Sequence, residues 1–199
     1  MLEIFQKGGP LMYPILICSV MALAIFLERV WTFYRIRRGT GHLVSEVENL
    51  SMKRHIDEAL VVCQRNGSPL ARIFIAALRS YGRSRDHIKT VVVEVGMREA
   101  APLEKYLGLM GTIATISPLL GLLGTVLGMI EAFTVIATHG AGTPATLGSG
   151  ISQALITTAA GLSVAIPTIL LHKYLTSRVD RIALDFEEYS LRLVDLLGD

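Results

Sequence analysis

Two long stretches without a charged residue constrain the fold of this chain more than any other feature. The first runs from Leu107 to Ile130, and the second from Ile151 to Leu171. A helix needs about 20 mostly apolar residues to cross the hydrocarbon core of a bilayer, and both stretches reach that length. The sequence therefore predicts membrane-spanning helices over residues 106–137 and 151–171, joined by a short loop over residues 138–150.

A third apolar run, from Leu11 to Leu27, is followed directly by Glu28 and Arg29. It is long for the apolar core of a signal peptide, and no small-residue cleavage site follows it. Apolar residues make up 51% of the chain and its mean hydropathy is +0.50, which is typical of a membrane protein. We expect residues 1–34 to hold a short N-terminal segment and a retained first membrane helix.

Basic residues predict how the three spans are oriented. Residues 35–105 carry thirteen Lys and Arg, and the segment over residues 172–199 carries four. The loop over residues 138–150 carries none, and only Lys7 precedes the first span. Because loops rich in Lys and Arg stay in the cytoplasm, the sequence predicts a multi-pass protein with its N-terminus outside and its C-terminus inside.

The two cytoplasmic segments are predicted to be helical. Apolar residues recur at helical spacing in three stripes within residues 35–105, which indicates a helical collar whose last helix runs on into the second membrane helix. In residues 172–199, apolar residues alternate spacings of four and three, as in a heptad seam. That seam consists of Leu175, Val179, Ile182, Phe186, Tyr189, Leu193 and Leu196. The fold class is therefore all-α, with long helices extending from three spans into the collar.

The sequence shows no pattern typical of an enzyme, a metal site or a cofactor site. Cys18 and Cys63 are far apart and are predicted to be free thiols, and the five histidines are scattered. The net charge of +2 is too small to indicate binding to nucleic acid. We expect no catalytic residue, no metal and no cofactor.

Small residues and prolines set the two charge-free spans apart from plain membrane anchors. Small residues let helices approach closely, because lipid offers no hydrophobic drive for their association. Prolines inside a span remove a backbone hydrogen bond and favour a kink. The predicted packing residues are Gly121, Gly124, Gly128, Gly161, Pro118 and Pro167.

Hydroxyl groups in the same spans leave two interpretations open. Each Thr can bond to a carbonyl of its own helix, so that the pattern serves packing alone. Alternatively, the hydroxyls line a conduit or face a partner helix. Glu131, near the outer end of the second span, is either an interfacial residue or part of a proton relay. Thr and Gln do not titrate near neutral pH, so a proton crossing the mid-membrane by hopping needs a carboxylate from a partner.

Three segments carry a resemblance to a known family. The sequences SPLLGLLGTVLGMIEAF (117–133) and GISQALITTAAGLSVAIP (150–167) resemble the hallmark segments of the MotA/TolQ/ExbB proton channel family. The sequence GGPLMYPILICSVMALAIFLERVWTF (8–33) resembles the first helix of the ExbB/TolQ branch. Three spans with an outside N-terminus also fit that branch, because the flagellar stator branch has four.

The resemblance implies an assembly and a function. It implies a homopentameric ring in the bacterial inner membrane, enclosing the single-span helices of a partner dimer of the ExbD/TolR type. An aspartate of the partner would carry the proton, and a TonB-like protein or the envelope would receive the work. The chain would thus couple the proton motive force to biopolymer transport. A non-conducting membrane scaffold is the alternative, since small-residue packing and a heptad seam would suffice for it.

The resemblance also implies a set of pore-lining residues. The threonines of the family that face the partner's aspartate match Thr125 and Thr158. The proton pathway is predicted to include Thr157, Gln153 and Glu131 beside them. ExbB and TolQ usually have a glutamate at the position of Gln153, whereas the amide here can form hydrogen bonds but cannot release a proton.

Overall fold

The computed structural model describes residue 5 and residues 8–139 and 144–198. Every regular element in those ranges is a helix, which confirms the all-α prediction. The helices are α2 (Met12–Met52), α3 (Ile56–Asn66), α4 (Pro69–Arg79), α5 (Arg85–Ala100), the short 3-10 helix η1 (Ala101–Glu104), α6 (Leu107–His139) and α7 (Pro144–Leu197).

Three helical stretches of the described chain are long and apolar enough to cross a membrane. They lie within Met12–Met52, Arg85–Thr138 and Gly148–Leu197. In the most apolar 18 residues of each stretch, only 22 to 28% is buried inside the chain. Large apolar side chains such as Leu119 and Leu155 are therefore exposed on the isolated chain, and lipid or other subunits must cover them.

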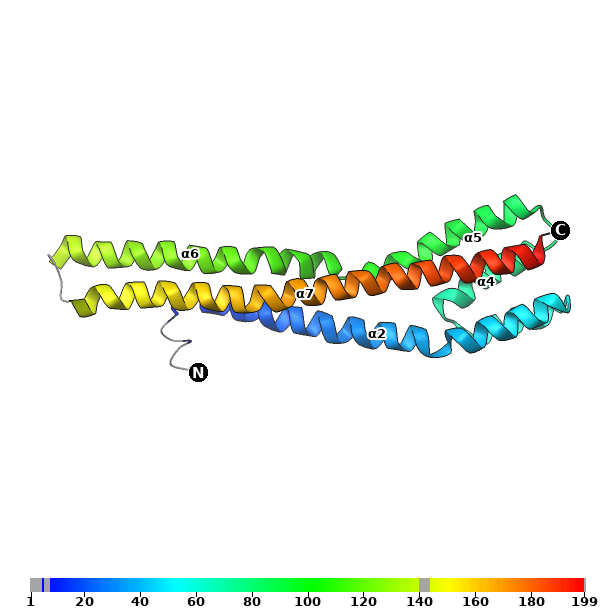
Figure 1. Ribbon diagram of the computed structural model, residues 1–199, viewed down its shortest axis with the longest axis horizontal. Coiled ribbons are helices and arrows are strands. Elements are labelled where there is room, and N and C mark those ends of the chain that lie inside the picture. The colour runs from blue at the N-terminus through cyan, green and yellow to red at the C-terminus, as the bar shows by residue number, and fades with distance from the viewer. Residues whose placement is uncertain (1–4, 6–7, 140–143, 199) are drawn as a thin grey trace. The chain divides into compact units, whose positions relative to one another are not determined.

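The chain divides into two compact units, which are described separately. The membrane unit comprises Met1–Leu27 and Tyr106–Tyr174, and the collar unit comprises Glu28–Lys105 and Leu175–Asp199. In the membrane unit, α6 and the first part of α7 run side by side (Figure 1). Pro118 lies inside α6 and Pro167 inside α7, and neither proline ends its helix.

Local sequence explains where the collar helices begin and end. Gly67 ends α3 with a φ of 63°, a left-handed conformation that glycine adopts without steric cost. Ser68 then caps α4, because its Oγ accepts a hydrogen bond from the amide of Ala71 at 3.2 Å. One of the three apolar stripes predicted within residues 35–105 falls on α4, where Phe74 and Leu78 are buried, and α4 packs against both α3 and α5.

The prediction that the last collar helix runs on into the second membrane helix is wrong. After α5 the chain tightens into η1, and Tyr106 adopts a φ of +68° before α6 begins. Pro102 accounts for the break, because it has no amide proton to donate to the preceding turn. The guanidinium of Arg29 also donates to the carbonyl oxygen of Pro102 at 3.2 Å, which holds the turn in place.

The C-terminal seam differs from the prediction at its end. Leu175, Val179, Phe186 and Leu193 are buried as expected, but Leu196 is 42% exposed. A straight α-helix has 3.6 residues per turn, so its buried face drifts away from a strict heptad. The end of α7 buries Ser190, Val194 and Leu197 instead.

The loop predicted over residues 138–150 is shorter than expected. Residues 140–143 lie outside the described residues, but α6 continues to His139 and α7 already begins at Pro144. Proline suits the first turn of a helix, because the amide proton it lacks has no partner there. The early turns of α7 also pack on α6, since a Cβ atom added at Gly150 would lie 2.8 Å from the carbonyl oxygen of Gly128.

Candidate functional site

The second and third spans approach each other closely along a line of small residues, which we call the α6–α7 seam. It comprises Ser117, Gly121, Gly124 and Gly128 of α6 and Gly150, Ala154, Thr157, Thr158 and Gly161 of α7. A Cβ atom added at Gly161 would lie 2.5 Å from the carbonyl oxygen of Ser117 and 3.1 Å from the Cα of Gly121. Real Cβ atoms essentially never approach within 3.0 Å, so these positions admit only glycine without a shift.

Thr158 bridges the two helices of the seam. Its hydroxyl donates a hydrogen bond to the carbonyl oxygen of Gly121 at 3.0 Å. The bond is possible because Gly121 has no side chain, and a Cβ atom there would lie 3.0 Å from the Cα of Thr158. Thr158 remains half-buried, so its hydroxyl oxygen can still accept a hydrogen bond from outside the chain.

Thr157 is buried and its hydroxyl is fully engaged within the chain. The hydroxyl lies 2.9 Å from the carbonyl oxygen of Gly8 and 2.8 Å from that of Gln153. The methyl group of Thr157 also fills the space beside Gly124, where an added Cβ atom would lie 2.5 Å from it. Thr157 is 1% exposed, so it joins the N-terminal segment, α6 and α7 rather than facing outward.

The other predicted pathway residues lie around this seam. The hydroxyl of Thr125 donates to the carbonyl oxygen of Leu122 at 2.6 Å, and the residue is half-buried. Gln153 is half-buried beside Gly9, and Glu131 is exposed near the C-terminal end of α6. The structure therefore brings Gln153, Thr157 and Thr158 together with glycines, whereas Glu131 is exposed on α6.

The chemistry available in the seam is hydrogen bonding without titration. Its polar groups are hydroxyls and backbone carbonyls, with the amide of Gln153 beside them, and none of these groups titrates near neutral pH. The hydroxyl of Ser117, also buried, donates to the carbonyl oxygen of Ile113 at 2.8 Å. Among the residues that the structure describes, no three His, Cys, Asp or Glu side chains come together as metal ligands would.

Sequence reasoning missed the part that Gly8 and Gly9 play at this site. Both glycines contact α7, although they lie more than a hundred residues away along the chain. The signal was the Gly-Gly-Pro sequence directly before the first span, since such a sequence is typical of a tight turn. Nothing in the sequence could indicate that the turn would pack on the third span.

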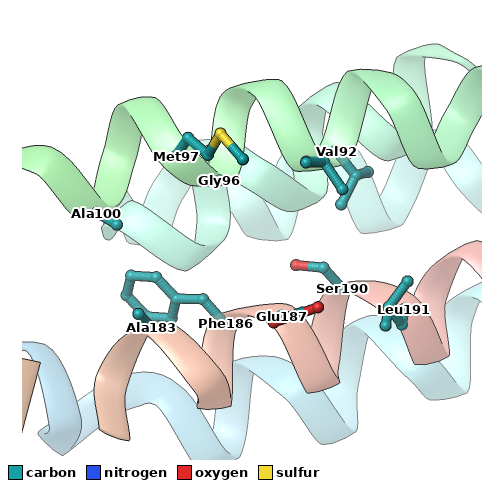
Figure 2. Close-up of a pocket in the computed structure, with 10 residues that line it drawn as sticks. Val92, Gly96, Met97, Ala100, Ala183, Phe186, Glu187, Ser190 and Leu191 are labelled. Carbon is teal, nitrogen blue, oxygen red and sulfur yellow. The ribbon is translucent and has the colours of Figure 1, made fainter. Parts of the chain in front are cut away.

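The collar unit holds an apolar groove that is separate from these residues. The groove has a volume of about 220 Å³ and lies between α5 and the end of α7. Figure 2 shows Phe186 and Ser190 of α7 facing Val92, Gly96 and Met97 of α5. Glu187 is its one charged lining residue, and one carboxylate among apolar side chains does not form an acid–base pair.

Comparison with known proteins agrees with this architecture. The profile of the MotA/TolQ/ExbB proton channel family matches residues 65–188. The putative biopolymer transport protein ExbB-like 1 of Synechocystis is 32% identical over 180 residues, which covers 89% of this chain and 71% of the relative. The biopolymer transport protein exbB1 of Vibrio cholerae is 31% identical over 198 residues, which covers 98% of this chain and 86% of the relative.

A shorter match links the chain to TolQ, the other protein after which the ExbB/TolQ branch is named. The Tol-Pal system protein TolQ of Haemophilus influenzae is 37% identical over 92 residues, which covers 46% of this chain and 40% of that protein. The predicted resemblance to ExbB and TolQ is thereby confirmed. With its three apolar helical stretches and the matches to ExbB and TolQ, the chain belongs to the MotA/TolQ/ExbB proton channel family, in its ExbB/TolQ branch.

Proposed function

We propose that this chain is an inner-membrane channel and stator subunit that couples the proton motive force to work across the cell envelope. The observation that carries the proposal is the α6–α7 seam, where uncharged hydroxyl groups lie between two apolar spans. Membership of a proton channel family supports conduction, and the names of the relatives point to biopolymer transport as the client process.

The titrating group comes from a partner in this proposal. The seam offers hydrogen bonds but no group that exchanges a proton near neutral pH, so a carboxylate must be supplied by another chain. A single-span protein of the ExbD/TolR type, present as a dimer inside a ring of five copies of this chain, supplies an aspartate. The exposed apolar surface of the spans is consistent with burial by neighbouring copies and lipid.

Thr158 and Thr125 are the residues that face this aspartate. Both are half-buried, and each hydroxyl already donates its proton to a carbonyl, of Gly121 and of Leu122 respectively. Their oxygens are therefore oriented as acceptors for a protonated carboxyl group. Thr157 supports them from the buried side, and Glu131 lies at the outer end, where it can collect protons from water.

The test is proton uptake by liposomes that contain the chain with its co-purified partner. Thr158→Val keeps the shape of the side chain but removes the hydroxyl, and we expect it to reduce potential-driven uptake at least tenfold. Thr112→Val is the matched control, because Thr112 is exposed and its hydroxyl bonds only to Gly108 of its own helix. Full uptake by Thr158→Val would show that this hydroxyl is not on the pathway.

A non-conducting scaffold is the second candidate function. The observation that favours it is that the hydroxyls of Thr125, Thr157 and Thr158 all donate within the chain. The same liposomes separate the two functions. Uptake that disappears when the acidic residue of the partner is neutralised supports the channel, and no uptake with the intact pair supports the scaffold.

A further inference from the structure

We propose that the Gly8–Gly9 turn positions the third span, and that it does so by packing against the side chain of Gln153. The inference deepens the proposed function, on which its consequence for proton flux rests. It assigns a place in the channel to the N-terminal turn, and it explains why an uncharged side chain stands at position 153.

The first contact joins the turn to Thr157. The carbonyl oxygen of Gly8 accepts a hydrogen bond from the Thr157 hydroxyl at 2.9 Å, in a buried environment. The hydroxyl has one proton and a second acceptor, the carbonyl oxygen of Gln153 at 2.8 Å. Loss of the turn would leave the second carbonyl as the sole acceptor and allow the Thr157 side chain to change its orientation.

The second contact joins the turn to Gln153. Gly9 has a φ of +72°, where a residue with a side chain is strained. A Cβ atom added at Gly9 would also overlap the Nε2 of Gln153 and lie 3.2 Å from its Cδ. Its backbone conformation therefore favours glycine at this position, and a Cβ atom there would also displace the amide end of the Gln153 side chain.

The turn is tied to the first span as well. The carbonyl oxygen of Gly9 accepts a hydrogen bond from the amide of Met12 at 3.2 Å, at the first residue of α2. A Cβ atom added at Gly8 would lie 2.7 Å from the Sδ of Met12 and 3.3 Å from the side chain of Ile156. The turn thus fixes the start of the first span against the third span, on the same side as Thr157.

This arrangement accounts for the amide of Gln153. A carboxylate there would be held beside the backbone of Gly9, where it would carry a charge and could only accept hydrogen bonds. Burial of such a charge without a partner is costly in a membrane. The side-chain amide of Gln153 has two N–H donors and carries no charge, so it is compatible with a turn packed against it.

A double-mutant cycle in the full chain tests the proposal. Gly9→Ala, Gln153→Ala and the double variant are purified in mild detergent with the partner, and their thermal midpoints are compared. We expect Gly9→Ala to lower the midpoint by roughly 5 °C or more, because overlap adds to backbone strain. In the Gln153→Ala background, where the overlap is absent and the backbone strain remains, the same substitution should lower the midpoint by less.

Gly148→Ala is the matched control, since a Cβ atom added at Gly148 meets no atom within 4 Å. It should not lower the midpoint. Equal losses from Gly9→Ala in both backgrounds would overturn the proposal. If Gly9→Ala alone cannot be purified, recovery of the double variant supports the proposal, and failure of both variants overturns it.

Proton flux measured on the same samples distinguishes a failure of the proposed channel function from a failure of the positioning role. Gly9→Ala should reduce partner-dependent uptake severalfold, and Gln153→Ala should restore part of it. Absence of uptake in the unmodified chain would refute the proposed function, whereas the thermal coupling between positions 9 and 153 would still support the packing of the turn against Gln153. Normal uptake in a Gly9→Ala variant with a lowered midpoint would overturn the positioning role.

Discussion

Substitution of Gly161 by alanine is the sharpest test of the close approach between α6 and α7. The added Cβ atom would lie 2.5 Å from the carbonyl oxygen of Ser117 and 3.2 Å from the amide nitrogen of Gly121. Both neighbours are backbone atoms of a packed helix, so relief requires the helices to separate. Overpacking of this kind costs about 1–3 kcal/mol.

Two further terms act on the same variant. Separation of the helices weakens the hydrogen bond from Thr158 to Gly121, which in a membrane is worth about 0.6 kcal/mol. Replacement of glycine by alanine in a helix favours folding by about 1 kcal/mol. The unfavourable terms outweigh the gain, and we expect a net loss of about 0.6–2.6 kcal/mol.

The assay is thermal unfolding in mild detergent, followed by helical circular dichroism. A loss of this size should lower the midpoint of a chain of this length by roughly 1–10 °C. Gly148→Ala in the same helix is the control, because its Cβ atom meets nothing within 4 Å and only the helix-propensity gain remains. A midpoint for Gly161→Ala equal to or above that of Gly148→Ala would refute the described packing of the seam.

Two other predictions concern the collar unit. Arg29 is 5% exposed and donates to the carbonyl oxygen of Pro102, so Arg29→Met should destabilise the chain by about 1–3 kcal/mol in the same thermal assay, whereas Arg35→Met at an exposed position should not. Burial, with Glu46 nearby, raises the pKa of the Cys63 thiol to about 12. Because the thiolate is the reactive form, maleimide should not label Cys63 at pH 7–8 unless the chain is denatured. Mass spectrometry locates the label, and rapid labelling of Cys63 in the folded chain would contradict its burial.

The long elements of the fold could be predicted from the sequence because their signals are local. A charge-free stretch of sufficient length predicts a span regardless of its neighbours, and helical spacing predicted buried residues such as Val179 and Phe186. The errors arose where tertiary contacts decide. The break before α6 depends on Pro102 and on Arg29 far away in sequence, and the buried face at the end of α7 drifts from the heptad to Leu197.

The candidate site was only partly predictable for the same reason. The small residues and hydroxyls of the two spans were visible as a pattern, but their partners were not. The sequence left open whether each threonine hydroxyl bonds to its own helix or elsewhere. In the structure the hydrogen-bond acceptors differ from one threonine to the next. Thr125 bonds within its own helix, Thr158 bonds across to Gly121, and Thr157 reaches Gly8 at the start of the chain.

Native mass spectrometry of the chain, purified in mild detergent with its co-purifying partner, tests the central claim most directly. Our account places a titrating carboxylate on a partner enclosed by copies of this chain, because the α6–α7 seam has no such group of its own. It therefore predicts a complex of five copies of the chain with two copies of a single-span protein. A monomer or dimer, under conditions that preserve other membrane assemblies, would contradict the account.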